Sequence, residues 1–278
     1  MASASFKFVR VEPAPSRSGV AVVWICKEPV NSMDMHLWSE LDGALTSIES
    51  AKDAPRAVIF ASGLKRHIFT AGNDLNELNA AATTKERFAG FWRAQTHFLA
   101  HLLRSPLVTV AAIKGACPAG GCITSLCCDY RVMTEKGHIG LNEVKIGVPV
   151  PEVWCKVMQR IVGPKAERLL LTGKTCAPSE AHALGLVDEV VPADKLMDAA
   201  RAAAQRFVKA AKPAGYAGTK FFLRGDLSAA LADGCEAEIV STWGFLSRDD
   251  VKGMVQAYLS ALGGGGGGKG KGGARAKL

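Results

Sequence analysis

The stretch Cys117-Pro118-Ala119-Gly120-Gly121-Cys122-Ile123 decides how the centre of this chain folds. It follows the apolar run 107–113, which is typical of a buried strand, and its paired glycines open a further apolar segment. Glycines at a helix start let backbone N–H groups point at a ligand, because no Cβ stands in the way. Such N–H groups suit an oxyanion. Taken alone, the same glycines are also explained by a tight turn into a helix.

Strand-like and helix-like segments alternate on both sides of this stretch, which is the pattern of an α/β fold. The helix expected at 84–104 is stopped by Ser105-Pro106. The uniformly apolar strands are expected to be covered on both faces. The segments predicted here are strands at 20–25, 57–61, 107–113 and 130–133 and helices at 34–48 and 84–104.

The last part of the chain changes character. From residue 152 onward the pattern is helical, apart from a strand-like stretch at 186–191. We therefore expect one α/β domain over residues 1–262, with a C-terminal helical part at about 193–262. Residues 263–278 begin with six glycines and continue with Lys and Gly, a composition that predicts a flexible tail.

Composition excludes several classes of protein. The 278 residues are 48% hydrophobic and 22% charged, and they contain no apolar run long enough to cross a bilayer, so membrane insertion is not expected. Four cations in the tail (Lys269, Lys271, Arg275 and Lys277) supply half of the net charge of +8. No motif that reads nucleic acid is present, so a nucleic-acid partner is not expected.

Eight cysteines are present without a C-x-x-C pair, and the N-terminus lacks the apolar stretch of a secretory signal. They are expected to be reduced, in an intracellular protein. Metal binding by the group from Cys117 to Cys128 is disfavoured because His or Cys pairs at zinc spacing are missing. Small buried residues are the better explanation.

Two loops resemble the crotonase (enoyl-CoA hydratase/isomerase) superfamily. Residues 69–75, Phe-Thr-Ala-Gly-Asn-Asp-Leu, look like its first oxyanion-hole loop, and residues 118–122 look like its second. The resemblance covers residues 18 to 260 and implies a spiral of ββα units with C-terminal helices, assembled as a homotrimer or a dimer of trimers. It also implies that the N–H groups of Asn73 and Gly120 are the oxyanion donors.

The same resemblance assigns Ala71, Gly72, Asp74, Leu75 and Asn142 to substrate binding. Local structure offers other roles for the polar members of this set. Asp74 is a natural N-cap for a helix starting at Leu75, and Asn residues also form turns.

Glu143 is the candidate base. It is flanked by Ile139, Leu141, Val144 and Ile146, and a desolvated carboxylate has a raised pKa, which suits it to take a proton from carbon and return it. An exposed Glu whose apolar neighbours point inward is the alternative, and the family resemblance favours the catalytic role.

One position separates the activities found within the superfamily. Hydratases carry a second Glu where this chain has Ile123, and Ile has no acid or base group. The chain therefore resembles the Δ3,Δ2-enoyl-CoA isomerase branch, which converts 3-enoyl-CoA to trans-2-enoyl-CoA in fatty-acid β-oxidation. No metal or redox cofactor is implied, because CoA arrives as part of the acyl-CoA substrate.

Two alternatives stay open. A dienoyl-CoA isomerase would use an Asp where Pro151 stands, and the adjacent Glu152 could substitute for it. A non-catalytic acyl-CoA-binding protein of the same fold would keep the loops without turnover, although the intact Glu143 argues against it.

The chain ends in Ala276-Lys277-Leu278, which resembles the Ser-Lys-Leu peroxisomal address. A flexible tail would present this tripeptide to a peroxisomal import receptor. We therefore expect a peroxisomal location, with a cytoplasmic or mitochondrial one as the alternative.

Overall fold

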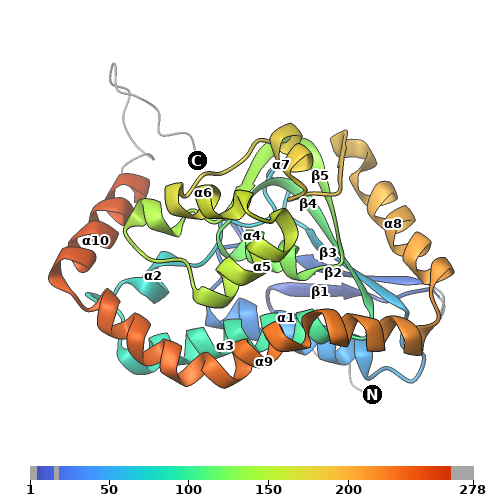
Figure 1. Cartoon of the computed structure of the whole chain (residues 1–278), viewed down its shortest axis with the longest axis horizontal. Helices are drawn as coiled ribbons and strands as arrows, with labels where there is room; N and C mark the ends of the chain where they lie inside the picture. Colours follow the sequence, from blue (N-terminus) through green and yellow to red (C-terminus); the bar gives the residue numbers. More distant parts are fainter. Residues whose placement is uncertain (1–4, 16–18, 264–278) are drawn as a thin grey trace.

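A six-stranded sheet lies at the centre of the computed structural model, which describes residues 5–15 and 19–263 (Figure 1). Its strands follow one another in chain order, and only the first pair is antiparallel. The strands are β1 (Val9–Glu12), β2 (Val20–Ile25), β3 (Ala57–Ser62), β4 (Val108–Pro118), β5 (Tyr130–Gly140) and β6 (Glu189–Val191). The expected α/β class is confirmed.

Helices connect and cover these strands. They are α1 (Met35–Glu49), α2 (Leu75–Leu78), α3 (Lys85–Arg104), α4 (Gly120–Cys127), η1 (Glu143–Ile146), α5 (Glu152–Val162), α6 (Lys165–Thr172), α7 (Pro178–Leu184), η2 (Ala193–Lys195), α8 (Leu196–Ala210), α9 (Pro213–Leu246) and α10 (Asp249–Gly263). The side chains of Asp34 and Thr84 accept hydrogen bonds from the first turns of α1 and α3. These caps explain why both helices begin where the sequence predicts.

The strands β4 and β5 are longer than the sequence predicts. Their pairing shifts register between Ile113 and Gly115 and then continues to Pro118 and Gly140. Gly115 (φ +78°) and Gly137 (φ +135°) adopt conformations that side chains disfavour, and a Cβ on Gly137 would lie 2.2 Å from the Gly115 carbonyl oxygen. The two glycines thus let both strands bend and extend to the edge where the site lies.

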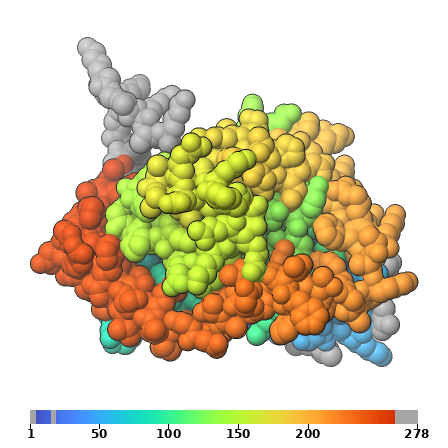
Figure 2. All heavy atoms as spheres, in the orientation of Figure 1, coloured from blue at the N-terminus to red at the C-terminus, as the bar shows by residue number. Residues whose placement is uncertain are grey.

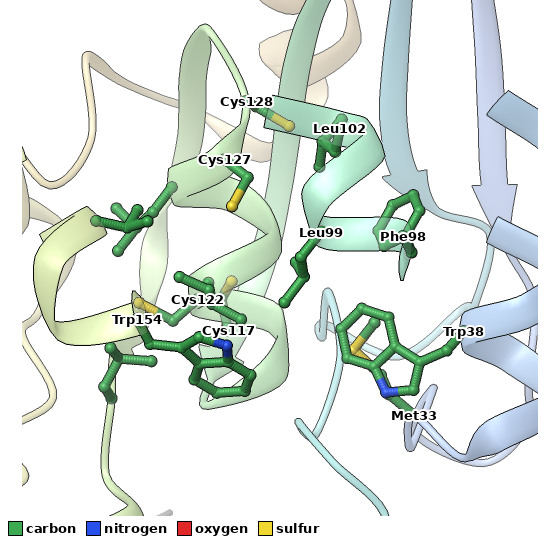
Figure 3. Packing of buried hydrophobic residues seen from close by; sticks show 14 of the residues in the cluster. Met33, Trp38, Phe98, Leu99, Leu102, Cys117, Cys122, Cys127, Cys128 and Trp154 are labelled. Atoms are coloured by element: carbon green, nitrogen blue, oxygen red, sulfur yellow. The ribbon is translucent and has the colours of Figure 1, made fainter. Parts of the chain in front are cut away.

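Both faces of the sheet are buried, as expected for apolar strands. Along β3, Val58 and Phe60 point into the larger core, whereas Ile59 points into a second core beneath α8. Figure 3 shows part of the larger core, where Trp38 and Phe98 lie on one side of Leu99 and Trp154 and Cys122 on the other.

The short strand β1 was not predicted from the sequence. Its residues, Val-Arg-Val-Glu, alternate between apolar and charged, and only Val9 is fully buried. It pairs with β2 alone at the edge of the sheet. Four residues of this kind give too weak a periodic signal to identify a strand.

The C-terminal helices pack around the outside. Helix α9 runs along α3, and α10 lies near α2 and η1 (Figure 1). Figure 2 shows α9 and α10 forming a continuous margin along the lower and left edges of this face. The predicted tail and its terminal tripeptide fall on residues outside the described ones, apart from Gly263, which ends α10. Across the described residues, no helix is long and apolar enough to cross a membrane.

Candidate active site

The ends of two neighbouring parallel strands bring the sequence-predicted groups together. Pro118 at the end of β4 pairs with Gly140 at the end of β5. Helix α4 starts at Gly120 directly after β4, and η1 starts at Glu143 shortly after β5. Because the strands are parallel, Gly120 and Glu143 emerge at the same edge of the sheet.

A strained turn aims the first N–H groups of α4. Ala119 adopts φ +48° and ψ −117°, which is a glycine-like conformation, and its N–H donates to the Gly140 carbonyl oxygen at 2.9 Å. Gly120 follows as the first residue of α4, so its N–H lacks an intrahelical acceptor. Among the described residues, no other acceptor is recorded for it.

Backbone hydrogen bonds hold the loop at 69–74 in place. The N–H groups of Phe69 and Thr70 donate to the Ala116 carbonyl oxygen, at 2.9 and 3.3 Å. Met33 donates to the Gly72 carbonyl oxygen at 2.9 Å and accepts from the Asp74 N–H at 3.0 Å. Within the described part of the chain, the Asn73 N–H between them has no recorded acceptor and is free to meet a ligand.

The two loops meet at Gly120. A Cβ on Gly120 would lie 2.8 Å from Asn73 Oδ1, 3.1 Å from a ring carbon of Trp38 and 3.3 Å from Asn73 N. The site therefore has no room for a side chain at this position. The absence of that side chain is what brings the N–H groups of Asn73 and Gly120 close together, the arrangement that stabilises an oxyanion.

Glu143 is a buried carboxylate without a partner. It is 9% exposed, and among the described residues neither of its carboxylate oxygens has a hydrogen-bond partner. Desolvation raises its pKa to about 7. Burial raises the pKa of the Cys122 thiol in α4, and the Glu143 carboxylate adds to this rise. Such a group can hold or release a proton near neutral pH.

The remaining predicted residues occupy the same edge in different ways. Ala71 is exposed, Gly72 is buried, and Leu75 is half-buried at the start of α2. Asp74 accepts a hydrogen bond from Asn76 N at 3.0 Å and is therefore the N-cap of α2, as its residue type suggested. Asn142 precedes η1, half-buried and with no side-chain capping bond.

The structure also places Ile123 and Glu152, the residues on which the hydratase and dienoyl-CoA isomerase alternatives depend. Ile123 lies in α4 and is 1% exposed, so an apolar side chain fills the place where hydratases carry a carboxylate. The side chain of Glu152 is 77% exposed and pairs with Lys156 at 2.6 Å, which lowers its pKa. Glu152 is therefore solvated, unlike Glu143.

Two buried residues at the site were missed by sequence reasoning. Trp38 donates from Nε1 to Asn73 Oδ1 at 3.2 Å, and Asn73 Nδ2 donates to Gln95 Oε1 at 2.7 Å. Trp38 looked like one more apolar position of an amphipathic helix, and a single Gln in a helix carries no motif. No signal in one sequence could have paired them with Asn73.

Metal ligation finds no support at this edge. In residues 5–15 and 19–263, no group of three or more His, Cys, Asp or Glu side chains is arranged to hold a metal ion, and all eight cysteines are free. What the edge offers instead is a proton acceptor in an apolar setting and two unpaired N–H groups. This combination fits proton transfer next to a carbonyl whose oxygen gains charge.

Comparison with known proteins agrees with this geometry. Residues 16–262 match the enoyl-CoA hydratase/isomerase family, and the chain belongs to it. Human mitochondrial enoyl-CoA delta isomerase 1 is 35% identical over 258 residues, which cover 91% of this chain and 83% of the human protein. The mouse protein of the same name is 36% identical over 249 residues, with coverage of 88% and 84%.

Solved structures show the same relationship. The crystal structure of human mitochondrial delta3-delta2-enoyl-CoA isomerase matches with a TM-score of 0.89 at 34% identity, covering 94% of this chain and all of that one. An enoyl-CoA hydratase from Bacillus halodurans matches with a TM-score of 0.80 at 24% identity and coverage of 90% and 100%, which shows the shared fold. The expected crotonase fold is confirmed.

Proposed function

We propose that this protein is a Δ3,Δ2-enoyl-CoA isomerase, which converts 3-enoyl-CoA to trans-2-enoyl-CoA. The observation that carries the proposal is the buried carboxylate of Glu143, whose oxygens have no partner among the described residues and whose pKa is raised to about 7, at the same sheet edge as the free N–H groups of Asn73 and Gly120. The similarity to isomerases over most of the chain supports it.

The reaction needs one proton to move between two carbons. The Glu143 carboxylate takes a proton from C2, and the electron pair of that C–H bond delocalises onto the thioester oxygen to give a dienolate. The N–H groups of Asn73 and Gly120 donate to this oxygen, and each such donor is typically worth about 3–4 kcal/mol. The protonated Glu143 then returns the proton to C4, which moves the double bond to C2 and regenerates the base.

The setting of Glu143 suits both halves of this transfer. A base must be deprotonated to begin and must become a competent acid once it holds the proton, so a pKa near the working pH serves both steps. Burial without a hydrogen-bond partner achieves this for Glu143. An ordinary exposed Glu would be a weaker base toward carbon.

Hydration would need a second acid or base group to activate water and complete the addition. Ile123 fills the position of that group with an apolar side chain. General acid–base assistance is typically worth about 10²–10⁴-fold, so efficient hydration is not expected. The dienoyl-CoA isomerase alternative is weakened as well, because Glu152 is exposed and paired with Lys156.

The reaction is expected to need no cofactor besides the CoA of the substrate. We also propose a homotrimer or a dimer of trimers. Helix α9 exposes Phe221 (60%), Phe222 (85%) and Leu223 (61%) in succession, and adjacent large apolar side chains of this kind mark protein interfaces. Light scattering on the purified protein tests the assembly, and a monomer at micromolar concentration would exclude it.

For location we propose peroxisomes, because Ala276-Lys277-Leu278 resembles the Ser-Lys-Leu peroxisomal address. The human and mouse relatives are named as mitochondrial, so the two compartments are competing outcomes. A fluorescent protein fused to the N-terminus should localise to peroxisomes, and removal of the last three residues should abolish this. Unchanged location after the deletion would refute the proposal.

The activity test follows conjugation of the double bond with the thioester by ultraviolet absorbance, using trans-3-hexenoyl-CoA. We expect a rise in absorbance with the wild type, near-loss of it with Glu143→Gln, and wild-type rates with Glu152→Gln as the matched control. Acyl-CoA binding without turnover by the wild type would favour the non-catalytic alternative. Activity that depends on Glu152 would favour the dienoyl-type arrangement.

A further inference from the structure

Asn73 is held by its side chain as well as by its backbone. Its amide oxygen accepts from Trp38 Nε1 at 3.2 Å, and its amide nitrogen donates to Gln95 Oε1 at 2.7 Å. Trp38 comes from α1 and is fully buried, and Gln95 comes from α3 and is 1% exposed. One loop side chain is thus fixed between two buried partners on different helices.

The chemistry of the three groups gives this chain of hydrogen bonds one direction. An indole N–H can only donate, so it must meet the amide oxygen of Asn73. The amide nitrogen of Asn73 can only donate, so Gln95 must present its oxygen. Neither amide can be reversed without losing a buried hydrogen bond, and this fixes the rotamer of Asn73.

The side chain of Asn73 also sets the spacing of the two loops. A Cβ on Gly120 would lie 2.8 Å from Asn73 Oδ1 and 3.1 Å from a ring carbon of Trp38. The amide oxygen and the indole ring therefore stand directly against Gly120. A shift of either group would change the distance between the Asn73 and Gly120 N–H groups.

The two helices that supply the partners are themselves joined. The ring of Trp38 packs on Phe98 of α3 with centroids 5.8 Å apart. Further along, His101 of α3 lies 2.7 Å from Asp42 Oδ1 and 2.9 Å from Glu49 Oε2, both on α1. The anchor points for Asn73 are thus fixed relative to each other by contacts outside the site.

We propose that Trp38 and Gln95 are positioning residues that act through the side chain of Asn73 to hold its backbone N–H in register with that of Gly120. The proposal rests on the proposed isomerase function, in which these two N–H groups bind the dienolate oxygen. It goes beyond that function because two buried residues, Trp38 and Gln95, would contribute to stabilising the dienolate indirectly, through Asn73.

The test compares Trp38→Phe and Gln95→Met with controls that alter packing or a buried hydroxyl but leave the Asn73 bonds intact. The controls are Phe88→Leu, which changes a buried ring of α3 that packs on Phe91, Trp92 and Trp243, and Thr96→Val, which changes a buried polar residue next to Gln95. Two readouts are needed: kcat and KM with trans-3-hexenoyl-CoA, and the absorbance shift of bound 2,4-hexadienoyl-CoA, whose carbonyl is polarised by oxyanion donors.

We expect kcat to fall about 10- to 100-fold in Trp38→Phe and Gln95→Met, with KM changed far less, because a displaced donor weakens the transition state more than the ground state. The absorbance shift of the bound dienoyl-CoA should shrink in the same two variants and persist in both controls. Wild-type kcat and absorbance shift in Trp38→Phe and Gln95→Met would overturn the proposal, and so would equal losses in the controls.

A double-mutant cycle separates positioning from general damage to the fold. Asn73→Leu keeps the backbone N–H and removes both side-chain bonds, so Gln95→Met should cause no further loss in that background. Losses that multiply would overturn the proposal. The wild type could also shift the absorbance of bound dienoyl-CoA, and lose that shift in Trp38→Phe and Gln95→Met, without isomerising 3-enoyl-CoA. That result would refute the proposed function and leave the positioning role intact.

Discussion

The Ala119 N–H donates to the Gly140 carbonyl oxygen at 2.9 Å, and this bond joins the two strand ends that carry the site. Ala119 immediately precedes Gly120, the proposed oxyanion donor, and Gly140 ends the strand that leads to Glu143. The proposed donor and the proposed base are therefore built on one rigid frame rather than on independent loops. A reaction that moves a proton next to a charged oxygen needs this fixed geometry.

The frame contains strain at Ala119. Its φ of +48° and ψ of −117° are unfavourable for any residue that has a Cβ, and such backbone strain typically costs about 1–3 kcal/mol. We expect Ala119→Gly to raise the free energy of unfolding by about 1 kcal/mol, because the strain relieved exceeds the entropy that a glycine adds to the unfolded chain. Urea unfolding measures this change. A lower free energy of unfolding would show that the Ala119 methyl group contributes more by packing than its backbone costs.

Gly120→Ala should disable the site while the fold remains. Its Cβ would come within 2.8 Å of Asn73 Oδ1 and 3.1 Å of Trp38, so the loops must separate. Loss of one oxyanion donor typically lowers kcat about 10²–10³-fold, and we expect a loss of this size. The matched control is Gly218→Ala in α9, where a Cβ meets nothing within 4 Å. Equal activity of both variants would exclude Gly120 from the oxyanion hole.

The pKa of Glu143 predicts how activity depends on pH. The pKa is raised to about 7, and the base must be deprotonated to begin, so kcat/KM should rise with pH through about 7 and then level off. The measurement is a pH–rate profile of isomerisation. A profile already flat from pH 5 would mean that Glu143 is not the base or is not desolvated in the free enzyme.

The same raised pKa predicts a cost in stability. The unfolded chain releases this proton near the ordinary value of 4.5, whereas the folded protein keeps it until about pH 7, so folding is progressively disfavoured between these values. At pH 8 the cost is about 3 kcal/mol, given about 1.4 kcal/mol for each pH unit. Glu143→Gln should therefore be more stable than the wild type at pH 8 and equally stable at pH 4. Unfolding curves at the two values test both statements.

Much of the fold followed from periodicity in the sequence. The strand at 20–25 was predicted with the bounds that the structure shows, and α1 and α3 begin one residue after the capping residues that opened their predicted segments. The predicted strand ends at 113 and 133 were too early, because Gly115 and Gly137 let the strands bend and continue to residues 118 and 140. A glycine that stops a strand and one that bends it cannot be distinguished without the partner strand.

Only part of the candidate site could be predicted from the sequence. Asn73 and Gly120 were predicted from two loops that resemble the oxyanion-hole loops of the family, and Glu143 from its apolar neighbours and the same resemblance. The structure shows what no motif carries: both oxygens of Glu143 lack a described partner, and Asn73 is held by Trp38 and Gln95. These facts depend on contacts between residues far apart in the chain.

A buried ion pair fixes α9 to the sheet. Lys220, 4% exposed, donates to Asp129 Oδ2 at 2.7 Å, and Arg224 donates to the other carboxylate oxygen at 2.7 Å. We expect Lys220→Met to cost about 1.5–3 kcal/mol, because the buried Asp129 carboxylate keeps Arg224 but loses the charged hydrogen bond from Lys220. The control is Lys156→Met, which breaks an exposed pair with Glu152 and should cost less than about 1 kcal/mol. Similar costs for the two variants would contradict this reasoning.

His101 of α3 and its partners Asp42 and Glu49 of α1 form a clamp between the two helices. This clamp should make the free energy of unfolding depend on pH in the alkaline range. Hydrogen bonds to Asp42 and Glu49 raise the pKa of His101 from 6.5 to about 9. The unfolded chain loses this proton near pH 6.5 and the folded protein near pH 9. The contribution of the clamp is therefore fully present below about pH 6.5 and is lost as the pH rises through 9.

We expect His101→Gln to lower the free energy of unfolding by about 1–2 kcal/mol at pH 6 and by little at pH 10. The effect at pH 6 is smaller than the pKa shift alone would give, because water still reaches the ion pairs of His101 and screens them. The side chain of His101 is 17% exposed, and that of Asp42 is 35% exposed, so added salt should weaken the effect at pH 6. The matched control is His97→Gln on the same helix, a residue for which no bond to a carboxylate is recorded in the described structure. If the wild type and His101→Gln lose stability in parallel from pH 6 to pH 10, the alkaline dependence arises elsewhere. Since α1 and α3 also carry Trp38 and Gln95, a rate of isomerisation that falls together with this stability loss would connect the clamp to the oxyanion loop.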